Sequence, residues 1–291
     1  MIAGFGPALV DVINVIDEYP EKGGHAVVKE SFVVPGGAAA NVIFGLASFG
    51  VKAKFYSPIG KDEEAEIFKN SMERAGVLLK LWEVDERTGI VEVFVDRSGE
   101  RTFFVHPNAS AHLDVEVSDE EFFDVDYVYL DPYPSDKSLE FHLDVAKKAK
   151  KFKIEVILNP GYPYASMGLK KLKDLLKYVD VLILSESELK LLGEKVFDFC
   201  STVVITRGKK GAEAYSNGAW FFERALEVTP VDTTGAGDAF AAGFIYGRIL
   251  GLDVKKCLKI GNFVASYNIQ HYGARSFPPK RLVDKFIESI S

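Results

Sequence analysis

Apolar residues gather in short runs along this chain, and the segments between the runs carry apolar positions at helical spacing. The short runs predict strands at 2–5, 31–34, 53–57, 77–84, 127–130, 154–158, 181–184 and 203–206. The helical patterns predict helices at 42–49, 63–75, 137–151, 170–178 and 254–269. Strands that alternate with helices indicate βα units on a mainly parallel sheet.

A different pattern occupies residues 89–106. Residues 89–96 and 101–106 are rich in valine and phenylalanine, and the four residues 97–100 between them include a glycine, which together are a hairpin signature. Together with the segment 25–34, this hairpin is expected to form a small antiparallel sheet that closes over a ligand site as a lid. The alternative is an ordinary solvent-exposed hairpin.

Length and composition limit the class of protein. A chain of 291 residues with 47% hydrophobic and 26% charged residues is globular, and its length suits one large domain or two small ones. No apolar run approaches the ~20 residues that span a bilayer, so no membrane partner is expected. The first residues lack a basic region and a small-residue cleavage site, which favours a buried first strand over a signal peptide and predicts a cytoplasmic protein.

Charge and cysteine usage exclude further classes. The net charge of −7 argues against nonspecific binding to nucleic acid or to anionic lipid. Cys200 and Cys257 stand alone, without a neighbouring cysteine or histidine cluster. This spacing fits buried thiols in a reducing compartment and does not predict structural zinc.

The most informative stretch is Thr233-Thr234-Gly235-Ala236-Gly237-Asp238, which runs directly into an apolar helix pattern. Thr233 or Thr234 can cap the first turn, and the glycines leave the backbone N–H groups open to a ligand. Such N–H groups at a helix N-terminus bind phosphate. Asp238 would repel a resting phosphate, so it indicates a base that takes a proton from an attacking hydroxyl. The alternative is an ordinary capped helix start.

A second glycine-rich stretch, 35–41, follows the strand predicted at 31–34. Gly36 and Gly37 allow the backbone to approach a ligand closely, and Asn41 offers both a donor and an acceptor to a polyol. In order and separation, the two stretches resemble the two signatures of the ribokinase-like (PfkB) carbohydrate kinase family, and the resemblance extends over the whole chain.

The resemblance implies a three-layer α/β/α sandwich, ribokinase-like, with a small antiparallel β lid. One domain would span 1–291, with the lid inserted from roughly 12–34 and 86–108. The implied activity is transfer of the γ-phosphoryl group of ATP to a hydroxyl of a small sugar or polyol. Asp238 would be the catalytic base, and Gly235, Ala236 and Gly237 would form the anion hole. Family lids also pair between subunits, so a homodimer through the lid is expected.

The acceptor site is implied by a group of matching positions. These substrate-binding candidates are Asp11, Gly36, Gly37, Asn41 and Asp131. Members that prefer ribose often carry Lys where this chain has Ala38, and no Arg follows Asn159 to pair a carboxylate. We therefore expect a free sugar or polyol other than ribose. The alternatives are a nucleoside kinase of the same fold and a noncatalytic sugar-binding regulator, which would have a damaged anion hole.

The donor site and its ions are also implied by the resemblance. Contacts to ATP are expected from Ser185, Thr206, Gly208, Gly211 and Asn262. Glu188 fits the acidic position of the family's Asn-x-x-Glu pattern and would hold Mg²⁺ through water, although Ser185 replaces the Asn. A plain N-cap is the alternative for this pair. Asp232, with 273–276, resembles the family's loop for a monovalent cation such as K⁺.

Overall fold

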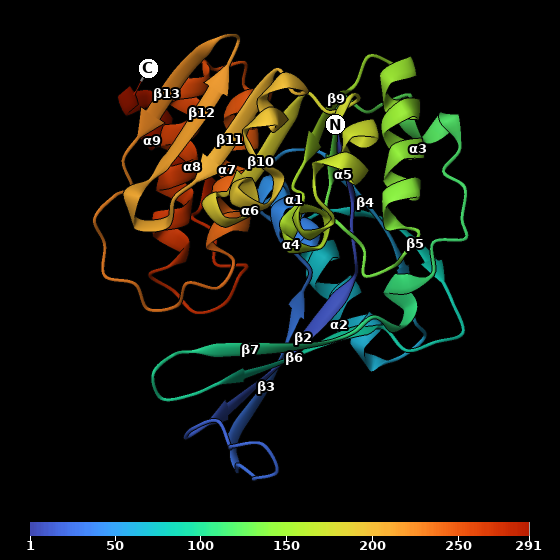
Figure 1. Cartoon of the computed structure of the whole chain (residues 1–291), viewed down its shortest axis with the longest axis vertical. Helices are drawn as coiled ribbons and strands as arrows, with labels where there is room; N and C mark the ends of the chain where they lie inside the picture. Colours follow the sequence, from blue (N-terminus) through green and yellow to red (C-terminus); the bar gives the residue numbers. More distant parts are fainter. Residues whose placement is uncertain (291) are drawn as a thin grey trace.

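A nine-stranded mixed sheet forms the centre of the computed structural model, which describes residues 1–290 (Figure 1). Its strand order is β13-β12-β11-β10-β9-β8-β1-β4-β5, and the strands from β11 to β5 pair in parallel while β12 and β13 run antiparallel. The strands are β1 (Ile2–Phe5), β4 (Ala53–Ile59), β5 (Leu78–Glu83), β8 (Tyr127–Leu130), β9 (Glu155–Leu158), β10 (Val181–Ser185), β11 (Thr202–Thr206), β12 (Ala212–Ser216) and β13 (Ala219–Glu223).

Helices cover both faces of this sheet. One face packs against α1 (Ala38–Ser48), α2 (Glu63–Arg74), α7 (Ala236–Ile249), α8 (Val254–Asn268) and α9 (Lys280–Ile290). The other packs against α3 (Ser138–Lys151), α4 (Gly161–Met167), α5 (Leu169–Leu176) and α6 (Glu186–Leu192). Side chains alternate across each strand, so Ile183 lies in the first core and Leu182 in the second. The predicted three-layer sandwich is confirmed.

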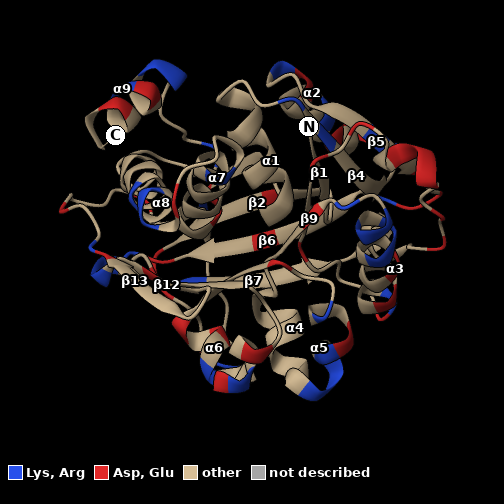
Figure 2. Cartoon of the chain, turned by 90° about the horizontal axis from the view of Figure 1, so that it is seen from above, with Lys and Arg blue, Asp and Glu red and all other residues tan. Residues whose placement is uncertain are grey.

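Charged residues lie mainly on the outer helices and loops, whereas the central strands carry few (Figure 2). Within residues 1–290, no helix is both long and apolar enough to cross a membrane. Helix α7 is the exception to the amphipathic pattern: it is apolar on nearly all sides and packs between α1 and α8. Helix α7 is therefore buried between two neighbouring helices.

A second sheet of four strands, which we call the small sheet, projects from the main body (Figure 1). Its order is β3-β2-β6-β7, with β2 at Leu9–Ile16, β3 at Val28–Gly36, β6 at Gly89–Val95 and β7 at Arg101–His106. The expectation of an antiparallel sheet is wrong, because β2 and β6 pair in parallel. The chain between them passes through α1, β4, α2 and β5 of the main body, and such a crossover permits parallel pairing.

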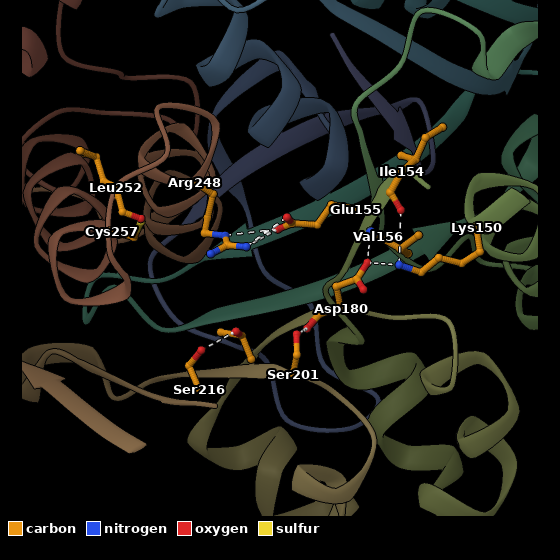
Figure 3. Close-up of polar contacts among 11 residues, drawn as sticks. Lys150, Ile154, Glu155, Val156, Asp180, Ser201, Ser216, Arg248, Leu252 and Cys257 are labelled. Carbon is orange, nitrogen blue, oxygen red and sulfur yellow. Dashed lines mark hydrogen bonds and ion pairs between the residues drawn. The ribbon is translucent and has the colours of Figure 1, made fainter. Parts of the chain in front are cut away.

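Ion pairs tie the helices to the amino ends of the strands, at the edge opposite Ser185 and Thr206 (Figure 3). Arg248 of α7 donates to the carboxylate of Glu155 at 3.0 Å. Asp180, just before β10, accepts from the Val156 N–H at 2.7 Å and pairs with Lys150 of α3. These contacts are structural, so the sheet is anchored at this edge and open for ligands at the carboxyl edge.

Element boundaries differ from the sequence-based expectations by a few residues, and some elements were not predicted. The hairpin of β12 and β13, the short helix α4 and the C-terminal helix α9 were missed. Strand β13 carries exposed apolar side chains such as Trp220 and Phe222, so its pattern does not separate a buried face from a solvent face.

Candidate active site

The helix start at Gly235 is the centre of the site. Gly235 is the N-cap of α7 and has φ 75°, a left-handed conformation that favours glycine, and a Cβ there would overlap Ala274. Neither Thr233 nor Thr234 caps the helix as expected, because the Thr234 hydroxyl donates to Asp232 at 2.6 Å instead. The backbone is thus shaped by glycine and by Asp232 rather than by a threonine cap.

Backbone N–H groups at this helix start remain available to a ligand. The Ala236 N–H donates to the Thr233 carbonyl at 3.3 Å, whereas those of Gly237 and Asp238 have no acceptor within residues 1–290. A Cβ built at Gly237 would meet no atom within 4 Å. Open space above unpaired donors at a helix N-terminus is the arrangement that binds an anion such as phosphate.

Asp238 lies beside these donors and is held by a side chain from another helix. Asn41 Nδ2 of α1 donates to Asp238 Oδ2 at 2.9 Å. Burial raises the pKa of Asp238 to about 7, the Asn41 hydrogen bond opposes the rise and the charge of Asp11 adds to it. A carboxylate with a pKa near neutrality and a fixed orientation is suited to accept a proton.

Arg275 connects the two glycine-rich stretches. Its guanidinium donates to Asn41 Oδ1 at 3.0 Å, to the Gly36 carbonyl at 3.0 Å and to Ser71 Oγ at 2.6 Å. It also lies 5.3 Å from the ring centre of Phe44. Burial lowers the pKa of Arg275 to about 10, and the charges of Asp11 and Asp238 oppose that effect. Arg275 therefore fixes the amide of Asn41 with its Nδ2 directed at Asp238.

Asp11 lies on β2 opposite Val34 of β3, and its carboxylate lies against Gly36, two residues further along β3. A Cβ at Gly36 would overlap the Asp11 carboxylate, so the glycine makes room for this acid. Burial raises the pKa of Asp11 to about 6, and the charge of Arg275 limits the rise. Gly37 has φ 91° and its Cβ would overlap the Pro7 carbonyl. Both glycines thus have conformational or packing reasons to be present, in addition to any contact with a ligand.

A cavity of about 740 Å³ brings the acceptor candidates together with the helix start. It is lined by residues from β2, α1, the small sheet and the start of α7, including Asp11, Gly37, Asn41, Thr234, Gly235 and Asp238. Asp131 does not line it, although it was expected to contact substrate. Asp131 is buried below α1, and burial, followed by the charges of Asp238 and Glu188, raises its pKa well above the usual range.

A second cavity of about 710 Å³ adjoins the first and shares Asp11, Gly99, Arg101, Phe103 and Thr234 with it. Its walls are mostly apolar and come from the inner face of the small sheet and from Tyr272. The main apolar contributors are Ile13, Val15, Phe32, Val93, Phe103 and Tyr272. The site therefore has a polar part at Asp238 and an apolar part under the small sheet.

Arg101 of β7 reaches the helix start from the small sheet. Its guanidinium donates to the Thr234 hydroxyl and forms an ion pair with Asp232 Oδ1. Asp232 Oδ2 accepts from the Gly273 N–H at 2.9 Å. This arrangement does not fit a monovalent cation bound directly by Asp232, because a guanidinium and backbone N–H groups already occupy both oxygens of that carboxylate.

The expected donor-site residues lie at the carboxyl ends of two adjacent strands. Ser185 ends β10 and Thr206 ends β11, and the two are paired in register. Gly208 and Gly211 follow in the next turn, and a Cβ at Gly211 would overlap the Glu223 carbonyl. Asn262 of α8 donates to the carbonyls of Glu223 and Arg224 at 3.1 and 3.0 Å. Its amide nitrogen therefore supports the chain after β13.

Glu188 and Ser185 form a capping box at the start of α6. The Ser185 N–H donates to Glu188 Oε2 at 2.7 Å, and the Glu188 N–H donates to Ser185 Oγ at 3.3 Å. Within residues 1–290 no three acidic, histidine or cysteine side chains converge to chelate a metal. The charges of Asp238 and Glu188 nevertheless both contribute to the raised pKa of Asp131. This donor set fits Mg²⁺ held through water rather than by a direct chelate.

Two arginines at the site were missed as site residues. Arg101 belonged to a segment assigned only to a hairpin, and Arg275 lay in the segment 273–276, which was assigned to a cation loop and not to contact with Asn41, 234 positions away. No local signal along the chain marks either contact, since both depend on how distant segments fold together.

Comparison with known proteins gives a consistent result. The model for the pfkB family carbohydrate kinase matches residues 1–281. A protein of Archaeoglobus fulgidus named an uncharacterized sugar kinase is 31% identical over 249 residues, covering 81% of this chain and 98% of that protein. An ATP-dependent ribose-1-phosphate kinase of Halopiger xanaduensis is 29% identical over 286 residues, covering 95% of this chain and 94% of that protein. The crystal structure of a Methanocaldococcus jannaschii nucleoside kinase superposes with a TM-score of 0.86 at 23% identity, covering 99% of this chain and 98% of that protein.

Proposed function

The chain belongs to the pfkB family of carbohydrate kinases, and we propose that it transfers the γ-phosphoryl group of ATP to a hydroxyl of a small sugar or polyol. The observation that carries this proposal is the Asn41–Asp238 hydrogen bond beside two unpaired N–H groups at a helix start. A base and an anion site within one cavity are what in-line transfer to a hydroxyl requires.

In this proposal each group has one task. Asn41 and Asp11 orient the acceptor, Asp238 Oδ1 takes the proton of the attacking hydroxyl, and the N–H groups of Gly237 and Asp238 donate to the transferred phosphoryl group. Gly235 and Ala236, which the family implies as parts of the anion hole, would shape the turn that presents these N–H groups, because the Ala236 N–H already donates to the Thr233 carbonyl. Bound Mg²⁺ would offset negative charge on the phosphates, and Glu188 would hold it through water.

The remaining roles are supported by position. The donor nucleotide would lie along Ser185, Thr206, Gly208 and Gly211, because carboxyl ends of adjacent parallel strands form the ligand edge of such sheets. Asn262 would then act indirectly, by supporting the chain beside the nucleotide. Asp131 would act from below α1, since it does not line the acceptor cavity.

We further propose that the small sheet closes over the acceptor and joins two subunits. Closure would exclude water, which would otherwise compete with the acceptor hydroxyl for the phosphoryl group. Val33 and Phe104 lie on the face of the small sheet that does not line the cavities and are 51% and 53% accessible, which suits burial against a second copy. Size-exclusion chromatography with light scattering tests this: a Phe104→Asp variant should run as a monomer if the parent is a dimer.

A reducing cytoplasmic setting is consistent with the two buried free cysteines.

The second candidate acceptor is a nucleoside. The apolar cavity under the small sheet, with Phe32, Phe103 and Tyr272 on its walls, has room for a base next to the polar part at Asp11. Three polar groups predicted for the acceptor favoured a sugar, but Asp131 is not among the residues that line the cavity. The observed site therefore keeps the nucleoside alternative open on specific structural grounds.

A phosphorylation screen at fixed ATP tests both candidates. Ketoses, aldoses, inositols, sugar acids, sugar phosphates and nucleosides would each be assayed for ADP release and for the phosphorylated product. We expect the highest kcat/KM with a sugar or polyol. If kcat/KM for a nucleoside exceeds that for every sugar, the acceptor is a nucleoside and the assignment as a kinase is unchanged. The Asp238→Asn variant is the matched control for contaminating kinases.

A further inference from the structure

Arg101 is the one Lys or Arg that lines either cavity in the part of the chain that the structure describes. It begins β7, directly after the turn at 97–100. Its side chain is 25% exposed and that of Asp232 is 11% exposed. The ion pair between them is thus partly withdrawn from water and links the small sheet directly to the phosphate-binding turn.

Asp232 organises two turns at once. Its Oδ1 accepts from the Thr234 N–H at 2.9 Å and its Oδ2 from the Gly273 N–H at 2.9 Å. Thr234 immediately precedes Gly235, and Gly273 opens the segment that carries Ala274 and Arg275. Burial acts to raise the pKa of Asp232, but hydrogen bonds from Arg101, Thr234 and Gly273 outweigh it and lower the pKa to about 2. The carboxylate is therefore ionised whenever the protein is folded at neutral pH.

An ionised Asp232 without a counter-ion would weaken the proposed anion site. Asp11 lines both cavities and Asp238 lines the one at the helix start, so two other carboxyl groups already lie near the site, and a bound phosphate would add negative charge. Partly buried like charges repel one another far more strongly than they do in water. A cation at Asp232 is needed, and the structure supplies a guanidinium from the small sheet.

We propose that Arg101 is a positioning residue that takes the place of a monovalent cation at Asp232. The inference rests on the proposed function. With the small sheet closed, the guanidinium neutralises Asp232 and holds Thr234 by its hydroxyl, so the turn before Gly235 has the shape that binds phosphate. With the small sheet open, Asp232 loses its counter-ion and the turn loses one of its anchors. Phosphate binding and closure are thereby coupled, and the protein works without K⁺.

The matched control is Arg97, which lies in the same hairpin. Its guanidinium pairs with Asp17 at 2.6 Å on the outer surface, where its side chain is 77% exposed. Arg97→Ala removes the same charge from the same hairpin, and Arg97 lines neither cavity. Arg101→Ala and Arg101→Lys then report on the cavity contact, and Lys retains the charge without the planar pair of donors.

The test compares KCl with choline chloride at equal ionic strength. For the parent and Arg97→Ala, we expect kcat and KM for ATP to agree within about twofold between the two salts. For Arg101→Ala in choline, we expect kcat/KM for ATP to fall roughly 10- to 100-fold, the worth of a charge-assisted hydrogen bond. Addition of K⁺ or of millimolar ethylguanidinium should restore much of that loss, and Arg101→Lys should fall between the two.

A second readout does not depend on activity. The melting temperature of Arg101→Ala should be higher in KCl than in choline chloride, because K⁺ can bind the vacated carboxylate, whereas the parent should melt at the same temperature in both. A parent enzyme that needs K⁺, or an Arg101→Ala variant that behaves like Arg97→Ala, would overturn the inference. If no acceptor is phosphorylated by any variant, the proposed function fails and the melting comparison alone decides the role of Arg101.

Discussion

The side-chain amide of Asn41 donates a 2.9 Å hydrogen bond to Oδ2 of Asp238, although the two residues are 197 positions apart. Because α1 packs directly against α7, the two glycine-rich stretches meet in space. The amide is fixed in turn by Arg275, which donates to its oxygen. Oδ1 of Asp238 has no hydrogen-bond partner within residues 1–290 and is the atom that we expect to take the acceptor proton.

Asp238→Asn should lower kcat by roughly 10²–10⁴, the usual contribution of a general base. The variant is nearly isosteric, and the oxygen of the introduced amide can still accept from Asn41, so ATP affinity should be retained. Steady-state kinetics and nucleotide titration check the two expectations separately. Turnover within a few-fold of the parent would show that another group is the base.

The pH dependence follows from the pKa of Asp238, raised by burial from its ordinary value of 3.8 to about 7. Below pH 7 the base is protonated, so kcat/KM should fall roughly tenfold per unit as the pH decreases. A flat profile between pH 5 and pH 8 would contradict the assignment.

The stability of the folded protein should change with pH in the opposite direction to kcat/KM. Between pH 3.8 and about 7 the folded protein holds a proton at Asp238 that the unfolded chain has released, so the contribution of this group to stability declines as the pH rises. Asp238→Asn removes the buried charge. Its melting temperature relative to the parent should therefore be higher at pH 8 than at pH 5, as differential scanning fluorimetry can measure.

The glycines of the helix start should separate structure from ligand binding. Gly235→Ala should destabilise the fold by about 1–2 kcal/mol or more, because Gly235 has a left-handed conformation and a Cβ would overlap Ala274. Gly237→Ala meets open space and should raise stability by up to about 1 kcal/mol. Its new methyl group should nevertheless raise the KM for ATP. Urea unfolding and kinetics of both variants, compared side by side, test the anion site: normal kinetics for Gly237→Ala would exclude close phosphate contact there.

Glu188→Gln should raise the Mg²⁺ concentration that gives the half-maximal rate. Gln can replace Glu in a capping box, so α6 and the overall stability should change little. Ser185→Ala is the complementary control, since it removes a cap worth about 1 kcal/mol but leaves the carboxylate. An unchanged Mg²⁺ titration for Glu188→Gln would leave the capping box as the whole role of the pair.

The sequence determined the layers of the fold and the helix start at Asp238, because both are encoded by neighbouring residues. The short apolar runs identified most of the central strands. Gly235 and Gly237 indicate by their residue type alone that the backbone at the helix start is accessible. The hairpin of β12 and β13 was missed, since its outer strand exposes apolar side chains. The pattern of apolar and polar residues in a segment indicates its conformation and its buried face, but not which other segment packs against that face.

Tertiary structure alone decided which side chains share the cavity. Arg275 beside Asn41, Arg101 on Asp232, and Asp131 beneath α1 depend on contacts between segments that lie far apart along the chain. The parallel pairing of β2 with β6 was decided in the same way, by the passage of the chain through the main body. A guanidinium at the end of a long side chain carries no periodic signal of its own, so its partner is set by packing and by the position of the nearest unpaired carboxylate.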